Sequence, residues 1–157
     1  MPSRSTRAEP VRVGLVSDTH DLLRPEVLAF LRGSDHILHA GDICGEAVLQ
    51  ALAQLAPLTA VRGNNDRGAW AQRLPETRTV DIAGVAIHLV HDLNDLVLPP
   101  QARVVVCGHS HQPKVEEREG VLYVNPGSAG PRRFRLPISV AELCIVRGGV
   151  TARLVAF

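Results

Sequence analysis

The chain has 157 residues, of which 45% are hydrophobic and 21% charged, and its formal net charge is +1. This length predicts one domain with a hydrophobic core, and the balanced charge argues against a stable complex with nucleic acid or with a membrane surface. No apolar stretch reaches the roughly 18 residues of a membrane span, and the polar segment Met1–Pro10 does not resemble a signal peptide. We therefore expect a cytoplasmic protein.

We predict that residues 1–10 form a disordered arm and that residues 11–157 form a single domain. In the first half of the domain, valine-rich or otherwise apolar runs alternate with two amphipathic segments. In chain order, the predicted elements are a strand from residue 11 to the residue before Asp18, a helix at 24–33, a strand at 36–40, a helix at 46–56 and a strand at 58–62. This alternation predicts right-handed crossovers and a parallel sheet.

The second half is rich in predicted hairpins, because tight turns containing glycine separate pairs of strand-like runs. The predicted pairs are 77–82 with 85–90, 114–118 with 121–124, and 138–146 with 150–155. A buried strand is expected at 103–107 and a short helix near 92–98. A parallel half followed by a hairpin-rich half indicates two packed sheets with helices outside.

Polar residues able to bind metal follow the predicted strands. They are Asp18 and His20, Asp42, Asn64, His91, and His109 with His111. Because ligands of open α/β sheets bind beyond the carboxyl ends of the strands, these side chains are expected to converge. Their N and O atoms, without a thiolate, suit divalent ions such as Mn, Fe or Zn. Seven ligands, including an aspartate able to bridge, indicate a site for two metals.

Each sequence motif of this expected metal site also has a simpler interpretation. An Asp-x-His triplet is expected by chance in about a third of chains of this composition. Gly41-Asp42 and Gly63-Asn64 are common turn sequences, and His109-Ser110-His111 is compatible with a solvated loop. The metal hypothesis depends on all of them occurring together at strand ends.

In order and spacing these residues resemble the calcineurin-like metallophosphoesterases, specifically their small single-domain bacterial and archaeal phosphodiesterase branch. The matching motifs are Asp18-Thr19-His20, Gly41-Asp42, Gly63-Asn64-Asn65-Asp66, His91, Gly108-His109-Ser110-His111 and Asn125-Pro126-Gly127-Ser128. The resemblance implies an α/β fold of two packed mixed β-sheets flanked by helices, a four-layer αββα sandwich. It assigns one metal to Asp18, His20, Asp42 and His111, and the second metal to Asn64, His91 and His109, with Asp42 bridging.

The same resemblance implies a metal-dependent phosphoric ester hydrolase that cleaves small phosphodiesters. Two divalent ions are expected, with Mn²⁺ preferred and Fe, Zn, Ni, Co or Mg as alternatives. A hydroxide that bridges the two ions would attack phosphorus in line. The residues expected to take part in catalysis are Asp42, Asn64, His91 and His109. The partner would be a small phosphoester substrate, and a homodimer or tetramer stays open because oligomers are common among relatives.

Two positions depart from the family pattern. Asn65 stands where many relatives have a histidine that is thought to protonate the leaving group, so activated aryl esters should be better substrates than alkyl esters. Asp92 follows His91, where relatives usually have glycine. A carboxylate there would repel an anionic substrate or recruit a further cation, or it would cap a helix.

Other residues have weaker signals. Arg132, Arg133 and Arg135 belong either to a solvated loop or to the substrate site. His36, His39 and His88 lie in strand-like runs, which favours core or edge positions over metal binding.

Two functions compete with the enzyme hypothesis on the same fold. One is a non-catalytic metal-binding scaffold, since the family resembles a retromer coat subunit of that kind. The other is a nucleotide-binding regulator. The complete set of ligand-type residues favours the enzyme.

Overall fold

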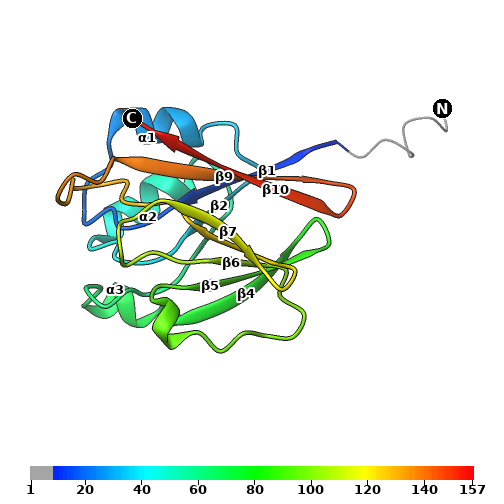
Figure 1. The fold of residues 1–157 in the computed structure, drawn as a ribbon. Coiled ribbons are helices and arrows are strands. Elements are labelled where there is room, and N and C mark those ends of the chain that lie inside the picture. The colour runs from blue at the N-terminus through cyan, green and yellow to red at the C-terminus, as the bar shows by residue number, and fades with distance from the viewer. Residues whose placement is uncertain (1–8) are drawn as a thin grey trace.

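The computed structural model describes residues 9–157, so most of the predicted arm at residues 1–10 lies outside the described residues. Two five-stranded sheets pack against each other (Figure 1). The first sheet has the order β10-β9-β1-β2-β3 and consists of β1 (Val11–Val16), β2 (His36–His39), β3 (Leu58–Ala60), β9 (Ser139–Val146) and β10 (Gly149–Ala156). Strands β1, β2 and β3 are parallel, whereas β9 and β10 form an antiparallel hairpin beside β1.

The second sheet has the order β4-β5-β6-β8-β7. Its strands are β4 (Thr77–Ile82), β5 (Val85–Val90), β6 (Val104–Val106), β7 (Lys114–Arg118) and β8 (Val121–Asn125). Strands β5, β6 and β8 are parallel, and β4 and β7 pair antiparallel at the two edges. Both sheets are therefore mixed, which confirms the predicted fold class.

Alternation along β1 explains how the sheets are held together. Val13 and Leu15 point into the core between the sheets, where they meet Val104 and Val106 of the second sheet. Val16 faces the other way and packs beneath the helices. All five side chains are fully buried, so each face of the first sheet is covered by apolar groups. The carboxyl ends of the parallel strands then lie together at one edge of the sandwich.

The helices are distributed unequally over the two sheets. Two of them, α1 (Pro25–Leu31) and α2 (Glu46–Ala53), cover the first sheet and bury Val27, Leu31 and Leu52. A further short helix, α3 (Ala69–Gln72), joins the same layer through Trp70 and was not predicted. None of the helices in residues 9–157 is long and apolar enough to cross a membrane.

The outer face of the second sheet is covered by the segment at 92–102, which contains one 3-10 helix, η2 (Leu93–Asp95). Leu96 of this segment packs against Val105 and Cys107. The fourth layer of the predicted sandwich is thus a single helical turn followed by coil. Pro99 and Pro100 account for this, because a residue without an amide hydrogen cannot continue a helix.

Candidate metal centre

Five of the seven predicted ligands meet at the carboxyl ends of β1, β2, β5 and β6. The Asp18 Oδ1 atom lies at the centre, 3.4 Å from Nε2 of His111, 3.8 Å from Nε2 of His20 and 4.0 Å from Nε2 of His91. The Asp42 Oδ2 atom lies 3.3 Å from Nε2 of His91 and 3.6 Å from Nε2 of His20. Imidazole nitrogens and carboxylate oxygens therefore point at a common space.

Within this cluster, two overlapping groups have ligand atoms close enough to hold a metal ion. One contains Asp18, His20 and His111, and the other contains Asp18, Asp42 and His91. Asp18 is common to both groups. The bridging role expected for Asp42 stays a prediction, although its Oδ2 atom lies near histidines of both groups.

The other two predicted ligands, Asn64 and His109, lie at the rim of the cluster. They contact each other through Oδ1 of Asn64 and Nδ1 of His109, 3.2 Å apart. The His109 ring packs edge-on against His91 with 5.2 Å between ring centroids, and 46% of its side chain is exposed. Both residues are exposed and border the candidate centre.

Left-handed backbone turns bring the ligands together. Asp18, His20, Asp42, His109 and His111 have φ values of 55°, 46°, 57°, 72° and 62°. In an extended chain residues two apart share a side, and on that ground the Asp18-Thr19-His20 sequence predicts that Asp18 and His20 point together. The positive φ values show that these turns, and not strand alternation, account for their proximity. Each such turn costs an L-residue roughly 1–2 kcal/mol. Concentration of this strain at one place is typical of a functional site.

Backbone hydrogen bonds between neighbouring loops hold these turns. The amide of Asp18 donates to the carbonyl of Gly41, and the amide of His20 donates to the carbonyl of Asp42, both at 3.0 Å. The amide of His109 donates to Oδ2 of Asp18 at 3.1 Å. Glycine at position 108 permits this close approach, since a side chain there would collide with Ser17 and crowd Asp18. The loops after β1, β2 and β6 thus support one another.

Further contacts orient the ligand side chains. The Nδ1 atom of His91 lies 2.8 Å from the carbonyl oxygen of Ala40, which fixes the hydrogen on Nδ1 and leaves Nε2 free to face the carboxylates. The Sγ atom of Cys44 lies 3.5 Å from Nδ1 of His20. The backbone amide of Asn65 donates to Oδ1 of Asp42, and its side-chain Nδ2 donates to Oδ2, both at 2.9 Å. Asn65, which stands where many relatives have a histidine, therefore fixes the orientation of the Asp42 carboxylate.

Asp66 also positions the site, although the sequence motif alone assigned it no role. Its Oδ2 accepts from the amides of Asp42 and Gly63, at 3.0 and 2.8 Å, and its Oδ1 accepts from the amide of Cys44 at 2.8 Å. The side chain is buried. Asp66 thus ties the loop after β2 to the loop after β3.

His39 links two ligand-bearing loops in a similar way, and its expected core position is confirmed. Its Nδ1 accepts from the amide of Gly41 at 3.1 Å, so the ring hydrogen is on Nε2, which lies 3.0 Å from Oγ1 of Thr19. The ring is fully buried, and burial lowers the pKa of His39 to about 3. A neutral His39 therefore connects Thr19 to the backbone before Asp42.

The cluster has the chemistry of a cation site. In residues 9–157, six buried side-chain N or O atoms lack a hydrogen-bond partner, and four of them belong to Asp18, His20, His91 and His111. Leaving such atoms unpaired costs about 1–3 kcal/mol each. Burial alone would lower the pKa of His91, but the carboxylates of Asp42 and Asp18 outweigh burial and raise it. A bound cation would satisfy the unpaired atoms of Asp18, His20 and His91 and would offset the excess negative charge.

The charged residues around the centre have separate roles. Oδ1 of Asp92 accepts from the amide of Asn94 at 3.0 Å and caps η2, which confirms the helix-cap interpretation. Its Oδ2 lies 3.6 Å from Nε2 of His109, so the carboxylate also borders the candidate centre. The three arginines of the 132–135 segment are exposed, as the solvated-loop interpretation expects.

A two-sheet sandwich that carries a His/Asp cluster at its strand ends defines a class of metal-dependent phosphoesterases. The chain belongs to the calcineurin-like phosphoesterase superfamily, whose family model matches residues 11–148. It is 36% identical over 140 residues to a probable metallophosphoesterase from Methanothermobacter thermautotrophicus, covering 80% of this chain and 81% of that protein.

Two solved structures show the same fold. An archaeal phosphodiesterase superposes with a TM-score of 0.77 at 21% identity, covering 92% of this chain and 99% of that one. Vacuolar protein sorting 29 from Cryptosporidium parvum superposes with a TM-score of 0.75 at 19% identity, covering 94% and 98%. At these identities the likeness establishes the fold alone.

Proposed function

We propose that this chain is a dimetal-dependent phosphodiesterase that hydrolyses small phosphodiesters. The observation that carries the proposal is the cluster of Asp18, His20, Asp42, His91 and His111. Within it, Oδ1 of Asp18 and Nε2 of His20 and His91 are buried and lack hydrogen-bond partners. Membership of the phosphoesterase superfamily and the fold shared with an archaeal phosphodiesterase support the same chemistry.

In this proposal, Asp18, His20, Asp42 and His111 would hold one divalent ion, and Asn64, His91 and His109 would hold the second, with Asp42 contributing to both. Mn²⁺ is the preferred ion, with Fe, Zn, Ni, Co and Mg as alternatives. When bound, the two ions would activate water as the nucleophile and would offset the charge that develops on the phosphate oxygens. No side chain then needs to act as nucleophile.

The chain's own residues set the geometry for this chemistry. Ala40 keeps the His91 ring in one orientation, and Asn65 fixes both oxygens of Asp42. His109 and Asn64 lie on the open side of the cluster, where a phosphodiester would enter. An asparagine amide cannot donate a proton to a departing alkoxide, so aryl leaving groups should react faster than alkyl ones.

The test is hydrolysis of bis-p-nitrophenyl phosphate by protein freed of metal and then titrated with Mn²⁺, with metal content measured in parallel. We expect turnover only with metal, and a loss of at least about 100-fold in kcat/KM with reduced metal content in Asp42→Asn. Asp81→Asn, at an exposed position near the end of β4, is the matched control and should behave as the unaltered protein.

Two outcomes would contradict the proposal. Turnover by metal-free protein would exclude the dimetal mechanism. Tight metal binding without turnover of any phosphoester would instead indicate the non-catalytic scaffold, and nucleotide binding without hydrolysis would indicate a regulator.

A further inference from the structure

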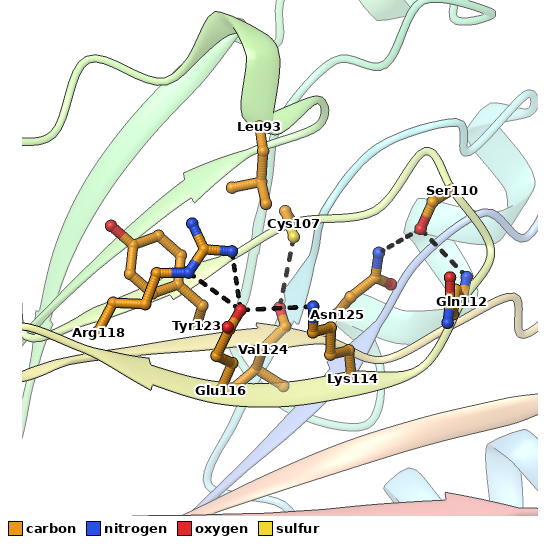
Figure 2. A pocket seen from close by; sticks show the side chains of 10 residues that line it. All are labelled: Leu93, Cys107, Ser110, Gln112, Lys114, Glu116, Arg118, Tyr123, Val124 and Asn125. Atoms are coloured by element: carbon orange, nitrogen blue, oxygen red, sulfur yellow. Dashed lines mark hydrogen bonds and ion pairs between the residues drawn. The ribbon is translucent and has the colours of Figure 1, made fainter.

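A cavity of about 210 Å³ lies between η2 and strands β7 and β8 (Figure 2). At one end it is lined by Ser110, which separates His109 from His111 in the chain. Nδ2 of Asn125 donates to Oγ of Ser110 at 3.1 Å and to the carbonyl of Gly108 at 3.0 Å. The cavity therefore begins at the loop that bears two of the predicted ligands.

The far end of the cavity is formed by a flat, fixed cation. The guanidinium of Arg118 lies over the ring of Tyr123, 5.0 Å from its centroid. Its Nε and Nη2 both donate to Oε2 of Glu116, at 3.0 and 2.7 Å. Figure 2 shows this Arg118–Tyr123 stack on the strands, with Leu93 reaching toward it from the η2 segment. A planar group could stack on the guanidinium with an apolar side chain at its edge.

The charge of the cavity tolerates an anionic ligand. Lys114 lies 3.4 Å from Glu116, so one carboxylate neutralises only one of two neighbouring cations. The volume is below the 300–1,000 Å³ typical of sites for whole ligands, which suits a part of a substrate.

We propose that this cavity binds the planar aromatic or heterocyclic ring of one ester group, such as a nucleoside, while the phosphate lies at the metal centre. This inference rests on the proposed phosphodiesterase function. Arg118 is then a specificity-determining residue: its planar guanidinium, held in position by Tyr123 and Glu116, favours a ring over an aliphatic chain.

The test uses three diesters that share the p-nitrophenolate leaving group and differ in the second ester group, which is methyl, phenyl or thymidine 5′. With the full chain loaded with Mn²⁺, we expect kcat/KM for the phenyl and thymidine esters to exceed that for the methyl ester by about tenfold. The difference should appear mainly in KM. A native protein without this preference would overturn the proposal.

Two variants and a control separate stacking from charge. The ratio of thymidine to methyl ester should fall toward one in Arg118→Ala and also in Arg118→Lys, which keeps the charge but loses the plane. Arg153→Ala is the matched control, because Arg153 lies on the other sheet but has the same kinds of contact as Arg118. Its Nε lies 3.2 Å from Glu142, and its guanidinium lies 5.7 Å from the centroid of the Phe30 ring. Native ratios in both Arg118 variants would overturn the proposal, whereas absence of hydrolysis of all three esters would refute the phosphodiesterase itself.

Discussion

Replacing Asp66 by asparagine should weaken both the fold and the affinity for metal. The carboxylate accepts three backbone hydrogen bonds, from Asp42, Gly63 and Cys44. An asparagine oxygen in place of Oδ2 can keep two of these bonds. Its side-chain NH2 group then faces the backbone amide of Cys44, donor against donor, and leaves that partly buried N–H without an acceptor.

The size of the effect follows from these contacts. A hydrogen bond to a charged group contributes about 1.5–3 kcal/mol and a neutral one about 0.5–1.5, so two bonds weaken by about 1 kcal/mol each. The unsatisfied amide adds about 1–3 kcal/mol. A total of about 3 kcal/mol or more lowers the Tm by roughly 6–12 °C for a chain of this length. Because the loop carrying Asp42 loosens, Mn²⁺ affinity should fall about 10–100-fold.

Thermal unfolding of the metal-free protein and calorimetric Mn²⁺ titration measure the two effects. Asp81→Asn is the control, since Asp81 accepts one exposed hydrogen bond from Gly84, and its Tm should stay within about 2 °C. An Asp66→Asn variant with native Tm and native Mn²⁺ affinity would refute the positioning role.

Three further changes test the surroundings of the centre. Because the folded state keeps His39 neutral down to about pH 3 while the unfolded chain binds a proton near pH 6.5, the free energy of unfolding should fall by about 2 kcal/mol from pH 7 to pH 5 through this residue alone. Urea denaturation at the two pH values should show that this fall in the free energy of unfolding is absent from His39→Gln. A variant with the same pH dependence as the unaltered protein would contradict the role of His39. In Gly108→Ala the added methyl group would collide with Ser17 and crowd Asp18, so Mn²⁺ affinity should fall about tenfold or more in calorimetry; native affinity argues against close packing at this position. Asn65→His should raise the rate on alkyl esters relative to p-nitrophenyl esters by at least about tenfold, because a general acid contributes about 10²–10⁴-fold to the rate. An unchanged ratio of the two rates would contradict the claim that the protein lacks a general acid at position 65.

Much of the fold could be predicted because its strands are short, apolar and separated by glycine turns. The ranges 77–82, 85–90 and 114–118 match β4, β5 and β7 residue for residue. Helix α3 was missed because four residues do not display a period. Helix α2 ends at Ala53, three residues before the predicted end, and propensity does not resolve such boundaries.

The convergence of the candidate ligands was predictable, but the geometry that brings them together was not. Parallel strands place their carboxyl ends at one edge, so Asp18, Asp42 and His91 could be expected to meet. The left-handed turns could not be predicted from the sequence, because glycine is the usual signal of such turns and the ligands here are aspartate and histidine. The roles of His39 and Asp66 depend on partners about 20 or more residues away in the chain, as in the contacts of His39 with Thr19 and of Asp66 with Asp42. A local motif does not report such contacts.

The central claim is that the cluster around Asp18 Oδ1 is a metal centre. Anomalous diffraction from crystals grown with Mn²⁺ tests it without reference to turnover. The account predicts two anomalous peaks among the ligands, one beside Asp18, His20 and His111 and one beside Asp42 and His91. Crystals with Mn²⁺ bound elsewhere, and with no peak among these five side chains, would contradict it.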